Sequence, residues 1–271
     1  MMMPPPSPPS SLLHRRSALA LAAGALAVAL GGCHSLTRPP LSSASPRPIR
    51  AIAFDALAVF DAGSVVARCE RAFPGQGEHL AASWRLRQFE YTWIRAVSRR
   101  PYIDFWHITQ DALVYAAKSM SLDLSLSTRS ELMDEWLSLR PWPDSVPALR
   151  ALKSAGLRLA VLSNFTAAMQ RECVHGSDLD GLFDDLLSTD AAGAFKPDPR
   201  AYQLAVSATG FNREEIAFAA FGGWDAAGSK SFGFRTIWIN RQGLPVEELG
   251  VEPDTTLSTL TGMAASLPPR A

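Results

Sequence analysis

The chain has 271 residues, of which 47% are hydrophobic and 19% are charged, and its 26 basic residues balance its 26 acidic residues. This balance excludes a strongly basic nucleic-acid binder as the default interpretation, and the apolar fraction excludes a highly charged disordered chain. The length is sufficient for one sizeable core, or for a core with a smaller companion domain. Three cysteines without a C-x-x-C pair cannot form a disulfide framework, and five scattered histidines disfavour a zinc site.

Residues 1–33 have the pattern of an export signal. A basic cluster at 14–16 precedes an uncharged stretch at 18–32 that is rich in Ala, Leu and Val. This stretch is too short for a comfortable membrane span, which needs about 20 residues, whereas a signal peptide combines a basic cluster with such a run. Its Leu-Gly-Gly-Cys end resembles the bacterial lipobox, which implies cleavage before Cys33 and lipidation of that cysteine. The alternative is a buried Ala-rich helix with an ordinary core cysteine.

Two features after the basic cluster bear on localisation. The paired arginines at 15–16 leave both twin-arginine and general export open. Either route predicts an exported protein, periplasmic or anchored to the membrane through a lipid on Cys33. Residues 34–49 are rich in Pro and Ser and predict a flexible linker. The globular part therefore begins near Arg50.

Short apolar runs separated by helical stretches predict the fold class of the globular part. Each run is bounded abruptly, as buried strands of a parallel sheet are. The four runs are Ala51–Phe54, Leu157–Leu162, Ile216–Phe221 and Thr236–Ile239. The helical stretches between them end at Gly156, Gly210 and Gly233, where helix C-caps usually fall. Alternating strands and helices predict an α/β fold with a doubly wound parallel sheet.

Residues 62–139 interrupt this alternation and are helical by pattern. Over Glu78–Ser98, side chains such as Trp84 and Gln88 recur at steps of three and four residues. Further helices are expected over Asp104–Ser119 and Ser127–Leu139, and Thr128-x-x-Glu131 fits a helix start. We therefore expect a helical cap over 62–139, inserted into a core that comprises 50–61 and 140–265.

Polar side chains follow the predicted strands or the crossovers between them. They are Asp55, Ser163, Asn164, Lys196 and Asp225. Because open α/β sheets bind ligands at the carboxyl ends of their strands, these side chains are candidate site residues.

This order of carboxylate, hydroxyl and amide, ammonium and carboxylate resembles the haloacid dehalogenase-like (HAD) superfamily. Over Ile52 to about Leu260 the chain is similar to the type II 2-haloacid dehalogenases. The stretches that carry the resemblance are Phe73-Pro74-Gly75-Gln76-Gly77, Trp84-Arg85 with Glu90-Tyr91-Thr92-Trp93, Leu162-Ser163-Asn164, Phe195-Lys196-Pro197-Asp198, Trp224-Asp225-Ala226-Ala227-Gly228, Phe232-Gly233-Phe234-Arg235 and Trp238-Ile239-Asn240-Arg241. The resemblance implies a HAD-like, Rossmann-like core with a helical cap.

The resemblance also implies a catalytic set on the core. A carboxylate can displace halide from an alkyl carbon and form an ester, and Asp55 would be this nucleophile. Lys196 would hold the Asp55 carboxylate ionised, since a nearby cation favours the charged form. Asp225 would orient Lys196 and the water that hydrolyses the ester. The implied reaction converts a small 2-haloalkanoic acid to a 2-hydroxy acid.

Further residues would bind the haloacid substrate. Arg85, from the cap, would bind its carboxylate or the departing halide, which are both anions. Ser163 and Asn164 would donate hydrogen bonds to the substrate carboxylate, and Tyr202 would position Lys196 or the substrate. An apolar wall around the halogen is expected from aromatic residues of the cap. These are Trp84, Trp93, Phe105 and Trp106. For Trp84 and Trp93, a place in the hydrophobic core is the favoured alternative.

We expect no cofactor, no metal and no nucleic-acid partner, and self-association as a homodimer is left open. The phosphatase branch of the superfamily has a second Asp two residues after its nucleophile, and Leu57 stands at that position here. Magnesium-dependent phosphoryl transfer is therefore the less favoured alternative within the enzyme interpretation.

Two departures from the family pattern keep a second class of function open. The family loop D-x-Y-G-T-L-F-D is one residue longer than the present Asp55–Asp61, which lacks its Gly and Thr. The family sequence S-S-N-A-W-D is replaced by a stretch that contains Gly222 and Gly223 in place of Asn-Ala. These losses favour a degenerate, non-catalytic exported binding protein, whereas the retained charged residues favour a hydrolase with weakened activity.

Overall fold

The computed structural model describes residues 47–267. The export signal, Cys33 and most of the expected linker lie outside the described residues, so those expectations are not addressed by the fold. The centre of the molecule is a six-stranded sheet in the order β5-β4-β1-β6-β7-β8, and every neighbouring pair is parallel. The strands are β1 (Ala51–Phe54), β4 (Arg158–Ser163), β5 (Asp185–Ser188), β6 (Ile216–Ala220), β7 (Arg235–Ile239) and β8 (Thr255–Leu257).

Strand β1 lies between β4 and β6 and is buried on both faces. Ile52 and Phe54 belong to one hydrophobic cluster, whereas Ala51 and Ala53 belong to another. Alternate residues of a strand point to opposite faces, so the two clusters are the cores on the two sides of the sheet. Burial on both sides explains why this strand is a continuous apolar run. The expected doubly wound parallel α/β sheet is confirmed.

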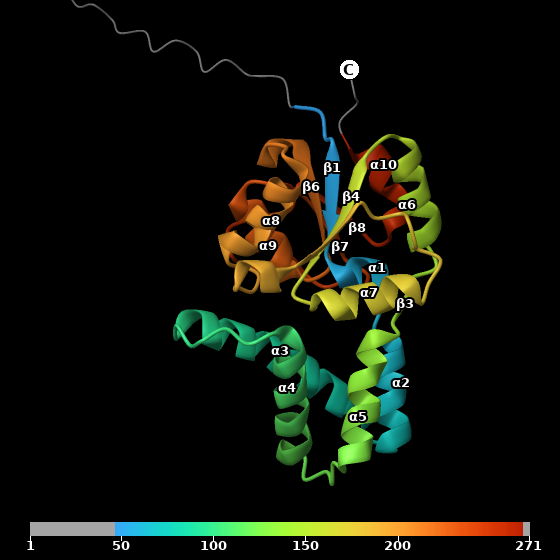
Figure 1. The fold of residues 1–271 in the computed structure, drawn as a ribbon, viewed down its shortest axis with the longest axis vertical. Helices are drawn as coiled ribbons and strands as arrows, with labels where there is room; N and C mark the ends of the chain where they lie inside the picture. Colours follow the sequence, from blue (N-terminus) through green and yellow to red (C-terminus); the bar gives the residue numbers. More distant parts are fainter. Residues whose placement is uncertain (1–46, 268–271) are drawn as a thin grey trace, which may run out of the picture. The chain divides into compact units, whose positions relative to one another are not determined.

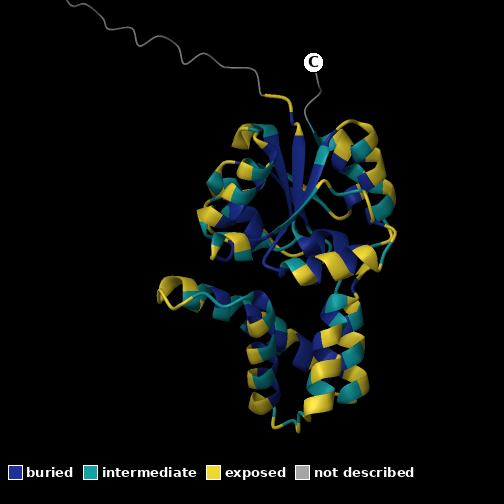
Figure 2. Cartoon of the chain, viewed as in Figure 1, coloured by how far each residue is buried: buried dark blue, intermediate teal, exposed yellow. Residues whose placement is uncertain are grey.

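Helices cover both faces of the sheet, as Figure 1 shows, with α8 and α9 on one face and α6 and α10 on the other. The burial colours of Figure 2 follow this arrangement, since the strands are buried while the outer faces of the helices are exposed. The helices of the core are α1 (Ala56–Val59), α6 (Ser145–Ser154), α7 (Ala167–His175), α8 (Pro199–Thr209), α9 (Gly223–Phe232) and α10 (Met263–Ser266). Short 3-10 turns lie at Glu135–Leu137, Thr189–Ala192, Arg213–Glu215 and Leu260–Gly262.

Four helices lie between Asp61 and Arg140, and they form the inserted subdomain. They are α2 (Gly63–Ala72), α3 (Gly77–Val97), α4 (Phe105–Ser119) and α5 (Leu126–Asp134). The chain enters this segment through β2 (Phe60–Asp61) and leaves it through β3 (Arg140–Pro141), and these two short strands pair antiparallel. The pairing fixes both connections of the insertion next to each other, directly after the Asp55 turn.

Three local predictions need correction or extension. Helix α5 begins at Leu126, one residue before the expected start, and ends at Asp134, where a 3-10 turn follows in place of the expected helix to Leu139. Its cap is Ser125, which accepts from the Thr128 amide, so the expected capping signature at Thr128 is wrong. Strands β5 and β8 were not expected, because both are short and carry polar residues.

None of the helices within 47–267 is both long and apolar enough to cross a membrane.

Candidate active site

Asp55 directly follows β1 and begins the α1 turn. Its amide donates to the carbonyl of Ala219 on β6 at 2.9 Å, which ties it to the neighbouring strand. Its Oδ1 accepts from the Leu57 amide at 3.0 Å, so the carboxylate caps α1. One carboxylate oxygen is therefore fixed by the backbone, and the side chain is 15% exposed. The partly exposed carboxylate can therefore reach a bound molecule.

Lys196 lies between two carboxylates. Its Nζ donates to Asp55 Oδ2 at 2.7 Å and to Asp225 Oδ2 at 2.6 Å, and its side chain is only 1% exposed. Burial alone would lower its pKa, but the charges of Asp225 and Asp55 outweigh burial and raise the pKa. Lys196 is therefore a permanent cation that holds the two carboxylates in register.

Asp225 lies in the first turn of α9 and is buried. Burial raises its pKa to about 6, and the charge of Asp55 acts in the same direction, while Lys196 and Tyr202 oppose the shift. Its Oδ1 accepts from the Tyr202 hydroxyl at 2.7 Å. Tyr202 is fully buried, and its hydroxyl holds the carboxylate that pairs with Lys196. This contact accords with the alternative in which Tyr202 positions Lys196.

Gly228 is a part of this arrangement that sequence reasoning did not single out. A Cβ at this position would lie 2.6 Å from the Tyr202 hydroxyl oxygen and 2.7 Å from the Pro197 Cβ. Only glycine therefore allows α9 to approach α8 closely enough for Tyr202 to reach Asp225. The Trp-Asp-Ala-Ala-Gly stretch contained the signal, since its glycine lies three residues after the carboxylate.

Ser163 and Asn164 end β4 beside this group, and both are buried. Asn164 Oδ1 accepts from the Lys196 amide at 3.0 Å and from the Thr189 hydroxyl at 3.3 Å. Ser163 Oγ accepts from the Phe165 amide at 3.2 Å. The side-chain oxygen of Asn164 thus positions Lys196. The hydroxyl proton of Ser163 and the side-chain NH2 group of Asn164 remain as donors that can face a substrate carboxylate.

Arg85 comes from α3 and lies within an aromatic surround. Its guanidinium carbon is 5.1 Å from the ring centre of Phe89, 5.6 Å from that of Phe221 and 6.0 Å from that of Trp136. Burial lowers its pKa to about 10, and the charge of Asp55 opposes this shift. Arg85 makes no ion pair with the residues at 47–267. A charged, poorly hydrated guanidinium is suited to bind an anion, and the charge of Asp55 favours its protonated form.

The aromatic residues of the cap have different surroundings. Trp84 is buried inside the cap, where its Nε1 donates to the Thr109 carbonyl at 2.7 Å, so it does not line the site. Trp93 instead packs edge-on against Trp224 at 5.6 Å, and Phe89 does so at 5.2 Å. Phe105 packs against Phe165 and Phe195, while Trp106 packs against the hydrophobic core. The ring that reaches Arg85 from the core, Phe221, was missed because nothing in a helical pattern of the cap indicates it.

Gly222 occupies the position where the family pattern has Asn. A Cβ there would lie 2.8 Å from Trp224 Nε1 and 3.1 Å from Trp224 Cδ1. The indole of Trp224 thus fills the room in which an Asn side chain would begin. The expectation that the supporting side chain is missing here therefore holds, and an indole takes its space.

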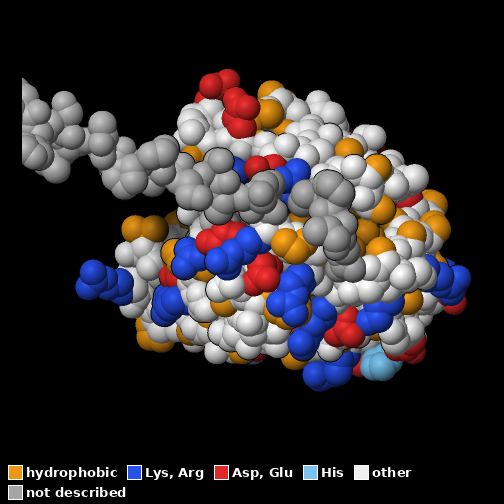
Figure 3. All heavy atoms as spheres, turned by 90° about the horizontal axis from the view of Figure 1, so that it is seen from above, with side chains coloured by type: hydrophobic (Ala, Val, Ile, Leu, Met, Phe, Trp, Pro, Cys, Tyr) orange, Lys and Arg blue, Asp and Glu red, His pale blue; other side chains and the backbone are white. Residues whose placement is uncertain are grey.

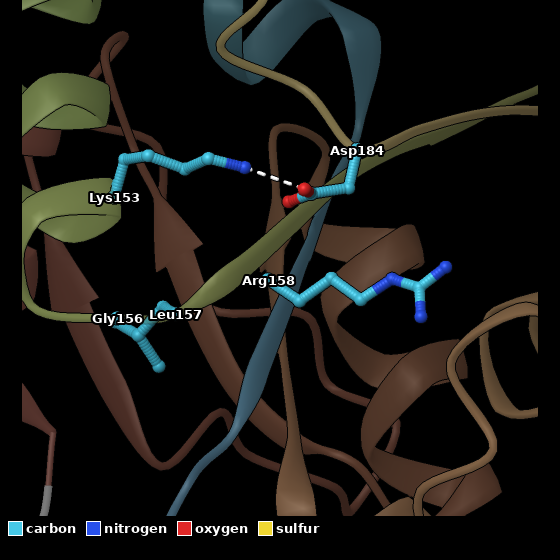
Figure 4. Close-up of a pocket in the computed structure, with 5 residues that line it drawn as sticks. All are labelled: Lys153, Gly156, Leu157, Arg158 and Asp184. Atoms are coloured by element: carbon cyan, nitrogen blue, oxygen red, sulfur yellow. Dashed lines mark hydrogen bonds and ion pairs between the residues drawn. The ribbon is translucent and has the colours of Figure 1, made fainter.

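A cavity of about 530 Å³ lies elsewhere, at the opposite end of the strands (Figure 4). Its lining residues are Lys153, Gly156, Leu157, Arg158 and Asp184. Lys153 pairs with Asp184 at 2.5 Å, and Arg158 pairs with the nearby Asp185 at 2.9 Å. These charges neutralise each other at the surface, so the hollow offers no reactive group that compares with the Asp55 cluster.

Comparisons with known proteins agree with this geometry. Residues 49–233 match the model of a family described as haloacid dehalogenase-like hydrolase. The chain is 41% identical to haloacetate dehalogenase H-2 of Moraxella sp. (strain B), over 79% of this chain and 96% of the relative. It is 44% identical to an (S)-2-haloacid dehalogenase of Pseudomonas sp. (strain YL), over 78% of this chain and 91% of the relative.

A solved structure extends the similarity to the fold. The L-2-haloacid dehalogenase from Xanthobacter autotrophicus, with chloropropionic acid covalently bound, is 32% identical and has a TM-score of 0.74. The match covers 80% of this chain and 97% of that one. Sequence, fold and the charged cluster at the strand ends together lead to one conclusion: the chain belongs to the haloacid dehalogenase-like hydrolase family.

Proposed function

We propose that the protein hydrolyses the carbon–halogen bond of a small 2-haloalkanoic acid and releases a 2-hydroxy acid through an ester on Asp55. The observation that carries this proposal is the Lys196 ammonium, which lies 2.7 Å from the partly exposed Asp55 carboxylate and 2.6 Å from the buried Asp225 carboxylate. The relatives named as haloacid dehalogenases support the carbon–halogen bond as the target.

In the first step a carboxylate oxygen of Asp55 attacks the carbon that bears the halogen. The new bond joins this oxygen to the carbon, and the halide leaves with the electron pair of the broken bond. Arg85 binds the substrate carboxylate or the departing halide, and its aromatic surround excludes water from that anion. The Ser163 hydroxyl donates to the substrate carboxylate and thereby orients the carbon toward Asp55.

In the second step water hydrolyses the ester. Asp225, which is ionised at neutral pH, takes a proton from the water as its oxygen attacks the Asp55 carbonyl carbon. The bond between that carbon and the ester oxygen breaks, the leaving alkoxide takes the proton back from Asp225, and the 2-hydroxy acid leaves with an oxygen that belonged to Asp55. The second proton of the water is released to solvent. Lys196 stabilises the negative charge that develops on the remaining Asp55 oxygen. The Asp55 carboxylate is restored with one oxygen from water.

The direct test is halide release from the two enantiomers of 2-chloropropionate by the chain that begins at about Ser35. We expect the (S)-enantiomer to be consumed and the (R)-enantiomer to be left, in keeping with the relatives named (S)-2-haloacid dehalogenase. Halide release from neither enantiomer, or only from (R), would contradict this proposal.

A degenerate binding protein is the second candidate, and the shortened loop after Asp55 together with the bare Gly222 favours it. A protein of this kind would bind 2-chloropropionate, as measured by calorimetry, without releasing chloride. Chloride release by the parent chain would exclude this candidate.

We also propose that the reaction needs no metal ion. Phosphoryl transfer in this superfamily requires a second carboxylate, whereas Leu57 stands at that position, and the Lys196 ammonium takes the place of a cation between the two remaining carboxylates. Chelation with EDTA should therefore leave turnover unchanged, and a strict magnesium requirement would sink this assignment.

Export and assembly complete the proposal. The lipobox-like end at Cys33 supports an exported, membrane-anchored lipoprotein, and Cys33→Ala should release the protein from the membrane fraction or leave it unprocessed.

Self-association as a homodimer is supported by three exposed apolar side chains of α3, which are Leu86, Ile94 and Val97. Sedimentation should then give twice the chain mass, and a monomer at micromolar concentration would contradict the dimer.

A further inference from the structure

The turn after Asp55 is held from outside by side chains of two distant segments. Three consecutive carbonyls of this turn accept hydrogen bonds from them. Leu57 O accepts from Trp142 Nε1 at 3.1 Å, and Ala58 O accepts from Arg241 Nη2 at 3.0 Å. Val59 O accepts from Ser145 Oγ at 2.7 Å and from the Trp142 amide at 3.0 Å. The last carbonyls of a helix usually lack partners, so this set of donors is complete for its turn.

Arg241 is itself immobilised. Its Nη1 and Nη2 donate to the two carboxylate oxygens of Asp144 at 2.9 and 3.1 Å, and its guanidinium carbon lies 4.6 Å from the ring centre of Trp142. Asp144 also accepts from the Leu260 amide at 2.6 Å, and the Arg241 side chain is 7% exposed. A forked ion pair of this type adds geometric restraint as well as energy. Arg241 therefore transmits the rigidity of the core to Ala58.

This turn needs external support. Four residues are far too few for a helix to be stable by itself. The Leu57 amide holds one oxygen of the Asp55 carboxylate at 3.0 Å, so any tilt of the turn moves the carboxylate. The loop is also one residue shorter than the family pattern and lacks its Gly and Thr. A displacement of about 1 Å at a reacting atom can cost about a hundredfold in rate.

We propose that Arg241, Trp142 and Ser145 are positioning residues of the reaction, a clamp on three carbonyls that aims the Asp55 carboxylate through the turn. The clamp contacts neither substrate nor reacting atoms, and its catalytic consequence rests on the function proposed above. The proposal gives a role to the Trp-Ile-Asn-Arg stretch, whose last residue is Arg241. It also gives a role to Trp142 and Ser145, which follow β3.

The test compares two clamp variants with a matched control. Arg241→Met removes the donor to Ala58, and Trp142→Phe removes the indole N–H that donates to Leu57 but keeps an aromatic ring. Arg241→Lys keeps the charge beside Asp144. Arg213 is the control, because its Nη1 also donates to a backbone carbonyl, that of Phe232 at 2.9 Å, and its guanidinium carbon lies 4.9 Å from an aromatic ring centre. Arg213→Met should lose a comparable contact far from Asp55.

Kinetics with (S)-2-chloropropionate measure the catalytic effect. Arg241→Met and Trp142→Phe should lower kcat by about 10- to 100-fold. Single-turnover experiments should show that the rate of ester formation on Asp55 is the step that becomes slower. KM should stay within about threefold, because Arg85 and Ser163 are untouched, and Arg241→Lys should recover part of kcat. A loss of kcat in Arg213→Met equal to that in Arg241→Met, or an unchanged kcat in both clamp variants, would overturn the proposal.

Amide hydrogen exchange of the segment Asp55–Phe60 tests the clamp without turnover. Exchange there should become faster in Arg241→Met and Trp142→Phe, and should stay at the parent rate in Arg213→Met. Unchanged exchange in the clamp variants overturns the proposal, whether or not the enzyme is active. If the parent chain releases no halide, the proposed function fails, and the exchange result alone still decides whether the clamp exists.

Discussion

The two ends of the central sheet carry similar charges in opposite surroundings. At the amino ends of the strands, the Lys153 and Asp184 side chains are each about one-third exposed beside an open hollow, and Figure 3 shows acidic and basic side chains interspersed over this face. At the carboxyl ends, Lys196 is buried between two carboxylates. Exposed pairs cost little and contribute little, because water screens them, whereas buried charges must be compensated in full.

The composition of the buried cluster shows what this difference means. Two carboxylates share one ammonium. Burial, aided by the charge of Asp55 and opposed by Lys196 and Tyr202, raises the pKa of Asp225 to about 6. Such a cluster is a poor way to stabilise a fold and a suitable way to prepare a nucleophile. Arg85 supplies the further positive charge, on the cap side, where an anionic substrate can meet it. The reactive chemistry is therefore concentrated at the carboxyl ends of the strands and not at the hollow beside Lys153 and Asp184.

The largest expected effect follows Asp55→Asn. The change is nearly isosteric but removes the negative charge, so it should lower turnover at least about a thousandfold. The melting temperature should stay close to that of the parent, because the backbone contacts of position 55 survive. Halide release measures the turnover, and differential scanning calorimetry measures the melting temperature. Retained turnover in this variant would show that Asp55 is not the nucleophile.

A smaller effect is expected for Arg85→Met, and it falls on KM where Arg85 binds the substrate carboxylate and on kcat where it binds the departing halide. The loss of a hydrogen-bonded charge contact costs about 1.5–3 kcal/mol, which corresponds to a rise in KM or a fall in kcat of about 10- to 100-fold. Arg87 on the same helix is the control, since it pairs with Glu90 at 2.6 Å and lies over Tyr115. Arg87→Met should leave KM and kcat unchanged. Equal KM and kcat values for the Arg85 variant and the parent would exclude Arg85 as the residue that binds either anion.

The pH dependence of turnover should report Asp225. Its carboxylate must be ionised to accept a proton, so kcat should fall as the pH decreases through about 6. The Tyr202 hydroxyl stabilises the ionised form and lowers this pKa, so Tyr202→Phe should move the acid limb to higher pH. An unmoved limb in this variant would show that the limb belongs to another group.

The smallest effect is expected at the other end of the sheet. Lys153→Met breaks the exposed pair with Asp184, and it should change the free energy of unfolding by at most about 1 kcal/mol and leave kcat and KM unchanged. Urea unfolding and halide release measure both quantities. A loss of activity here would break the comparison between the two ends.

Sequence reasoning reached the parts of this molecule that a local pattern determines. Residues 51–54 are buried on both faces, so they form an unbroken apolar run that reveals a strand, and the carboxylate that ends the run reveals the site. Strands β5 and β8 escaped, because Asp185–Ser188 and Thr255–Leu257 are short and partly polar.

The burial of individual side chains and the contacts between distant segments could not be predicted from the sequence. Tyr202 was expected to position Lys196 or the substrate. Its hydroxyl donates to Asp225, a contact that no helical period specifies. The aromatic surround of Arg85 includes Phe221, which is more than a hundred residues away in sequence. The three donors to the Asp55 turn likewise come from segments whose spacing gives no hint of a common target.

Transfer of oxygen from Asp55 is the central claim, and single turnover in oxygen-18 water tests it most directly. With enzyme in excess over (S)-2-chloropropionate, the product hydroxyl should carry ordinary oxygen, and the peptide that contains Asp55 should gain the heavy isotope, as mass spectrometry would detect. A labelled product after one turnover, together with an unlabelled Asp55 peptide, would mean that water attacks the substrate directly and would contradict the ester mechanism.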